Sequence, residues 1–228
     1  MLFGGSTGLD YTNAVHLFDT ETCQWQQLAV SGDAPSPRYK HSAVVHDDQL
    51  YIIGGGAFKP QMQLIEVYKL DLTTLVWTCV ATRGQIPRAR VAHSCAYDEA
   101  GADVYMFGGF TTELHCLRDF YSFSLQTHTW TRIAAPQLSA VPSARSFHSS
   151  VFYEGAVYIF SGSNGKDKFS DVWSYRVRAR IPPLLTLGAR ALCQQYESVE
   201  RLTTDLQHIL PNELLTALQN LNVAHQVA

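Results

Sequence analysis

The chain has 228 residues, of which 46% are hydrophobic and 16% are charged, and its net charge is -3. This composition excludes an intrinsically disordered chain. Because the chain has no run of lysines and arginines, we expect that it binds neither nucleic acid nor a membrane surface. No apolar run reaches the roughly 18 residues of a membrane span, the first residues lack a signal-peptide pattern, and the cysteine count is odd. We therefore expect a cytoplasmic or nuclear protein without a disulfide framework.

The first recurring feature along the chain is an apolar run that ends in two glycines. It occurs at Gly4-Gly5, Gly54-Gly55 and Gly108-Gly109, and a degenerate copy ends at Ser161-Gly162. Successive copies are 50, 54 and 53 residues apart. Glycine pairs allow the backbone to turn and to approach a neighbouring segment closely, so they predict a repeated tight turn.

Two further landmarks recur with a similar spacing of 52 to 55 residues. A tryptophan follows an apolar position by ten residues, and an Arg-x-x-His-Ser motif precedes an apolar run. The tryptophans are Trp25, Trp77 and Trp130, and the motifs begin at Arg38, Arg90 and Arg145. A tryptophan provides a large buried area, so we expect each one to fill the gap between neighbouring sheets.

Between these landmarks the hydrophobicity alternates with a period of two residues. Examples are 67–72 and 120–125, and such runs, interrupted by Gly, Pro and Asn, predict short antiparallel strands. Four strands in each unit of about 50 residues are typical of a β-propeller blade.

Taken together, the paired glycines, the spaced aromatic residue and the later tryptophan resemble the kelch repeat over residues 1–180. The Arg-x-x-His-Ser motif is similar to that of kelch domain-containing proteins and of Rab effectors with kelch motifs. The resemblance implies an all-β kelch β-propeller that binds protein.

The repeat array is incomplete. It begins at the second strand of one unit, and in the fourth unit the tryptophan position falls on Pro182, which leaves about three and a half blades. Closed propellers carry about 4–8 blades. Three interpretations stay open: a piece of a longer chain, closure by association with a second copy, or an unusually small closed propeller.

Residues 181–228 have a different pattern from the repeats. After Pro182-Pro183 the strand alternation stops, and leucines recur near helical spacing, which predicts a tail of two or three short amphipathic helices. One interpretation is that these helices only cap the propeller.

A second interpretation of the tail comes from its resemblance to two interaction motifs. One segment resembles an Elongin-binding box, although Gly188 departs from its pattern of Cys, Ala or Ser, and a later segment resembles a cullin-2-type box. The expected Elongin-binding residues are Leu184, Leu187, Gly188 and Ala191, and the expected cullin-binding residues are Leu210, Pro211, Leu214 and Leu218.

Together with the kelch repeats, the two boxes resemble the substrate receptors of Elongin–cullin-2 ubiquitin ligases. The resemblance implies Elongin B, Elongin C, cullin-2 and a substrate protein as partners. The alternative is a non-catalytic kelch scaffold that docks a trafficking or cytoskeletal partner.

The recurring arginines Arg38, Arg90 and Arg145 have two interpretations. They either bond to the loops between blades, or some of them face the channel and bind a substrate carboxylate, with which a guanidinium pairs well. The resemblance implies that the carboxylate belongs to a substrate's C-terminal tail. No HExxH, GxSxG or P-loop motif occurs, so we predict no catalytic, cofactor-binding or metal-binding residue.

Overall fold

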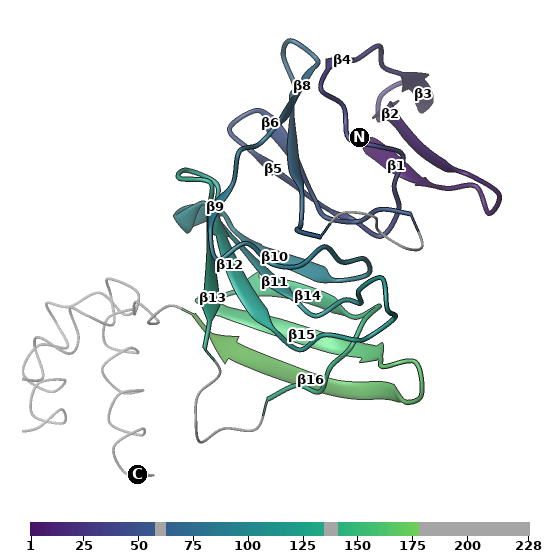
Figure 1. Ribbon diagram of the computed structural model, residues 1–228. Coiled ribbons are helices and arrows are strands. Elements are labelled where there is room, and N and C mark those ends of the chain that lie inside the picture. The colour runs from purple at the N-terminus through teal and green to yellow at the C-terminus, as the bar shows by residue number, and fades with distance from the viewer. Residues whose placement is uncertain (58–62, 135–140, 178–228) are drawn as a thin grey trace, which may run out of the picture. The chain divides into compact units, whose positions relative to one another are not determined.

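The computed structural model describes residues 1–57, 63–134 and 141–177 (Figure 1). In these ranges the chain consists of β-strands and one 3-10 turn, Glu99–Gly101. The strands form four sheets that follow one another in chain order, and we name them blades I to IV. The expected all-β propeller fold is therefore confirmed.

Blades II and III are complete four-stranded antiparallel sheets. Each also gains a two-residue parallel strand, β4 or β9, from the segment that enters the blade. Blade II contains β4 (Ser31–Gly32), β5 (Ser42–His46), β6 (Gln49–Ile53), β7 (Val67–Asp71) and β8 (Val76–Cys79). Blade III contains β9 (Arg83–Gly84), β10 (Ser94–Asp98), β11 (Asp103–Phe107), β12 (Phe120–Ser124) and β13 (Thr129–Ile133).

Blades I and IV have three strands each. Blade I contains β1 (Leu2–Ser6), β2 (Tyr11–Asp19) and β3 (Gln24–Gln27), and blade IV contains β14 (Ser149–Tyr153), β15 (Ala156–Ser163) and β16 (Lys168–Arg176). By register, β1 corresponds to the second strand of a complete blade and β16 to the third. The described residues thus form about three and a half blades, as predicted.

Apolar clusters join each blade to the next. Trp77 of blade II packs with Phe3 and Val15 of blade I, and Trp130 of blade III lies in one cluster with Ile53 and Val67 of blade II. Both tryptophans are only 1% exposed. The prediction that the tryptophans fill the gaps between sheets is confirmed for Trp77 and Trp130 but is wrong for Trp25, which is largely exposed on blade I.

The outward face of blade I is exposed at the positions that are buried in blade II. Trp25 corresponds to Trp77 but is 58% exposed, and Phe18, which corresponds to the fully buried Leu70, is 36% exposed. Blade IV shows the same contrast on its opposite face, where Val172 is 63% exposed and the corresponding Val67 is 1% exposed. No apolar cluster of the described residues joins blades I and IV.

The predicted helical tail, residues 181–228, lies outside the described residues, and so does its boundary with the repeats at residue 180. Within the described ranges, no helix has the length and hydropathy needed to cross a membrane.

Candidate protein-interaction surface

The Arg-x-x-His motif forms a buried clamp at each junction between blades. In blade III, Arg90 is fully buried, and its guanidinium binds both carboxylate oxygens of Asp119, one of them at 2.9 Å. The same guanidinium donates to the backbone oxygens of Gly108 and Arg88, each at 3.0 Å. A bidentate pair of this kind combines strong hydrogen bonds with a fixed geometry.

The other two arginines repeat this arrangement with their own partners. Arg38 binds Glu66 and the Gly54 oxygen, and Arg145 binds Asp171 and the Ser161 oxygen. The accepting oxygens belong to Gly54, Gly108 and Ser161, which are the first residues of the Gly-Gly or Ser-Gly pairs described above. The motif therefore holds the glycine turn of its own blade, through carbonyl groups that the strand ladders leave free.

Sequence reasoning missed the acidic partners of these arginines. Glu66, Asp119 and Asp171 each stand directly before the apolar residue that opens or continues the third strand of a blade, so their recurrence could have been found. Blade I has Ala14 at the corresponding position. A carboxylate recurring once per repeat, together with an arginine recurring once per repeat, is the signal that predicts buried pairs.

Substrate binding by Arg38, Arg90 and Arg145 stays a prediction. Their side chains are at most 2% exposed, and the donors named above bind acceptors within the protein. This geometry favours the interpretation that they hold the loops between blades. Any substrate carboxylate would have to compete with the carboxylates already bound.

Two of the three motif histidines, His41 and His148, pack against aromatic residues of the preceding blade. His41 lies 5.1 Å from Phe3, and His148 lies 5.4 Å from Phe107, each with the two rings edge to face. Burial, and then the neighbouring arginine, lowers the pKa of His41 and His148 to about 4 and that of His93 to about 3. The three imidazoles are therefore neutral in the folded protein at neutral pH.

These histidines predict a loss of stability in mild acid. In the unfolded chain they take up protons below pH 6.5, but in the folded chain only near pH 4 or pH 3. The unfolded state therefore binds more protons in this window, and stability falls as the pH falls from 6.5 towards 4. Urea unfolding at pH 7.0, 5.5 and 4.5 should show this decline, with a shallower slope for His93→Asn; equal slopes would contradict it.

The third residue of each motif joins a chain of backbone hydrogen bonds between blades. The Ala92 amide donates to the Lys40 oxygen at 3.1 Å, and the Phe147 amide donates to the Ala92 oxygen at 3.0 Å. All three residues have left-handed backbones, with φ of 55°, 56° and 57°. Consecutive blades thus present the same loop position side by side.

An exposed lysine, one exposed phenylalanine and two half-buried tyrosines lie at these loops. The Lys40 ammonium lies 4.6 Å above the centre of the Phe147 ring, and Phe147 is 56% exposed. The ring centres of Tyr39 and Tyr11 are 4.9 Å apart, with the rings tilted by 42°. We name Tyr11, Tyr39, Lys40 and Phe147 the entry-loop surface. Aromatic residues are enriched in protein interfaces, and an exposed ammonium group suits a carboxylate.

Comparison with known proteins decides the family. The model of the KLHDC2/KLHL20/DRC7 Kelch-repeats domain matches residues 1–64 and 40–181. This chain belongs to the kelch-repeat family. It is 31% identical to "Kelch domain-containing protein 10" of Rattus norvegicus over 96% of this chain and 54% of that protein. It is 32% identical to "Kelch domain-containing protein 3" of Homo sapiens over 77% of this chain and 48% of that protein.

The kelch chain spans about half the length of these relatives. Kelch repeats form protein-binding modules, and the blades described above are one. The expected Elongin-binding residues Leu184, Leu187, Gly188 and Ala191 lie outside the described residues. The expected cullin-binding residues, Leu210, Pro211, Leu214 and Leu218, lie outside them as well.

Proposed function

We propose that this kelch protein is the substrate-recognition subunit of an Elongin–cullin-2 ubiquitin ligase. The observation that carries the proposal is the order of the two motifs in residues 181–228. Leu184 and Ala191 have the spacing of an Elongin-binding box, and Leu210-Pro211, about twenty residues later, opens a cullin-2-type box. Both follow directly after the kelch repeats.

The proposed assembly uses an apolar helix face as its anchor. Leu184 fills a pocket on Elongin C, and Leu187 and Ala191 line the same face of the helix, which is a helix-in-groove interface. Leu210 and Pro211 set the contact with cullin-2. The receptor catalyses no bond formation itself; it raises the effective concentration of substrate lysines near the conjugating enzyme.

The kelch blades hold the substrate in this proposal. A substrate's C-terminal tail is the proposed ligand, and its carboxylate requires a cation. Lys40 on the entry-loop surface is exposed, whereas the guanidinium groups of Arg38, Arg90 and Arg145 are bound to carboxylates. Because its ammonium group is exposed, Lys40 is a further candidate for the carboxylate contact, beside the three arginines.

Co-expression with Elongin B and Elongin C tests the receptor role. We expect one stoichiometric complex on size-exclusion chromatography, and Leu184→Arg should abolish it because an arginine cannot enter an apolar pocket without a partner for its charge. Thr186→Arg is the matched control, because on a helix residue 186 lies about 200° from residue 184. This control should leave the complex intact.

Two results would contradict the proposal. A soluble, folded chain that forms no complex with the Elongins would leave a kelch scaffold for another protein. A complex that survives Leu184→Arg would show that the Elongin-box alignment is wrong.

A further inference from the structure

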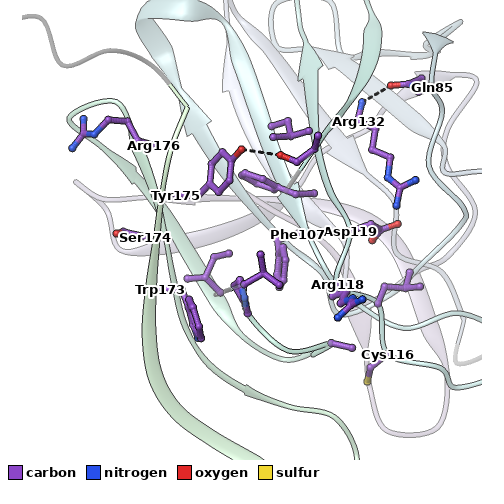
Figure 2. A pocket seen from close by; sticks show the side chains of 18 residues that line it. Gln85, Phe107, Cys116, Arg118, Asp119, Arg132, Trp173, Ser174, Tyr175 and Arg176 are labelled. Atoms are coloured by element: carbon purple, nitrogen blue, oxygen red, sulfur yellow. Dashed lines mark hydrogen bonds between the residues drawn. The ribbon is translucent and has the colours of Figure 1, made fainter. Parts of the chain in front are cut away.

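A groove of about 1130 Å³ lies at the junction of blades III and IV. Figure 2 shows its wall of aromatic side chains, with Phe107, Trp173 and Tyr175 labelled, and the charged residues Arg118, Asp119 and Arg132 beside them. The Tyr175 hydroxyl donates to the Ala134 oxygen across the groove at 3.0 Å. Its volume is large enough for a bulky side chain and part of a backbone.

The groove occupies the place that a fourth-strand tryptophan fills in the complete blades. Trp77 packs in one apolar cluster with Phe3, Val15, Ile52 and Leu70. By register, the residues that correspond to these four in blades III and IV are Phe107, Phe120, Ile159 and Tyr175, and all four line the groove. These four residues pack against one another as the apolar cluster between blades III and IV, in which Phe107, Phe120 and Ile159 are at most 8% exposed. The groove lies beside this cluster, at the place where a tryptophan packs in the complete blades.

The strand that borders this groove has an unpaired edge. Within the described residues, β15 is the only strand paired with β16, whereas the corresponding β7 and β12 are paired on both sides. The row of free N–H and C=O groups on β16 is a template for one more strand. An extended peptide can add there by main-chain hydrogen bonds, with its side chains setting the specificity.

The sequence after β16 does not suit this position. In blade II, Asp71 caps the turn into the fourth strand by accepting from the amides of Thr73 and Thr74, but Arg176 stands at the corresponding place in blade IV. Pro182-Pro183 falls where Trp77 and Thr78 stand. Successive residues of a strand point their N–H groups to opposite sides, so one of these two prolines would lack a ladder hydrogen bond.

The charges along the groove favour an acidic occupant. Within the described part of the chain, the guanidinium groups of Arg118 and Arg132 form no hydrogen bond or ion pair. Among the described residues that line the groove, the only carboxylate is that of Asp119, which is already bound to Arg90. The rim thus has an unneutralised positive charge.

We propose that β16 and this groove bind an extended acidic segment of another protein as the fourth strand of blade IV. An aromatic side chain of that segment lies in the groove and packs against the cluster of Phe107, Phe120, Ile159 and Tyr175. Its acidic residues pair with Arg118 and Arg132. This inference does not rest on the Elongin proposal, because it concerns a site on the blades and no residue of the tail.

A designed peptide tests the site with the full chain. The probe is a capped, labelled peptide with the sequence of residues 127–133, which includes a fourth strand and its tryptophan, flanked by two aspartates at each end. We expect saturable binding by fluorescence anisotropy, and binding about tenfold weaker or less when alanine replaces the peptide's tryptophan. Hydrogen exchange should show new protection in Lys168–Arg176 on binding.

Charge reversal at the rim supplies the matched comparison. The double variant Arg118→Glu and Arg132→Glu should weaken peptide binding about tenfold or more, and Arg88→Glu, an exposed arginine outside the groove, should change it less than twofold. No binding, an affinity insensitive to the tryptophan, or protection outside β16 would overturn the proposal. Protection of β16 in the free chain equal to that of β7 and β12 would also overturn it, because the edge would then be covered by the chain itself.

Discussion

Replacement of Arg90 by methionine should lower the free energy of unfolding by about 3–5 kcal/mol. The Arg90 guanidinium is fully buried and binds Asp119 and the oxygens of Gly108 and Arg88. Removing it leaves a carboxylate and two backbone acceptors without their donors in a largely buried place. Guanidinium chloride unfolding, followed by tryptophan fluorescence, measures the change.

Two companion variants separate the pair from the general effect of losing an arginine. Arg88→Met removes an exposed arginine two residues away and should change stability by less than about 0.5 kcal/mol. Adding Asp119→Leu to Arg90→Met should recover part of the loss, because the unpaired carboxylate is then removed. A loss below about 1 kcal/mol for Arg90→Met would show that the clamp contributes little to the stability of the blade.

Trp130→Ala should cost about 3–5 kcal/mol, whereas Trp25→Ala should cost less than about 1 kcal/mol. The two tryptophans occupy the same position of the repeat, but Trp130 is 1% exposed between blades II and III and Trp25 is 58% exposed on blade I. The first substitution leaves a cavity next to Phe123, whose ring centre is 4.7 Å away. The second removes a side chain that largely contacts solvent.

The same unfolding experiment measures both variants, so each serves as the other's control. Equal losses of unfolding free energy for Trp130→Ala and Trp25→Ala would contradict this prediction. They would show that the Trp25 face of blade I is covered in solution, for example by a second copy of the chain. The stability difference between the two variants therefore reports on whether the end of the blade array is open.

The repeat pattern predicted most of the fold because its landmarks report on backbone and packing needs. Left-handed turns need the glycine pairs, and the gaps between sheets need a large apolar side chain such as that of Trp77 or Trp130. Both needs recur once per repeat. The incomplete array was also predictable, since the missing strand positions appear as breaks in the repeat.

The site was less predictable because its groups come together only through tertiary contacts. Arg90 and Asp119 are 29 residues apart in the sequence, so their pairing is not visible in a local pattern. Considered without its acidic partner, the recurring arginine suggested a substrate site, whereas the structure has a buried ion pair there. The missing fourth strand of blade IV was visible in the sequence, but the groove beside β16 depends on how side chains of blades III and IV pack, which the repeat pattern does not show. The tail motifs rest on spacing alone.

Assembly with cullin-2 tests the central claim most directly. Purified chain, the Elongin B/C pair and the N-terminal part of cullin-2 are mixed, and the masses of the complexes are measured by mass photometry. The account predicts one species with the summed mass of all four chains, lost with Leu184→Arg and reduced to the Elongin complex with Pro211→Arg. A chain that leaves both partners unbound, or a four-chain species unchanged by either substitution, would contradict the receptor role.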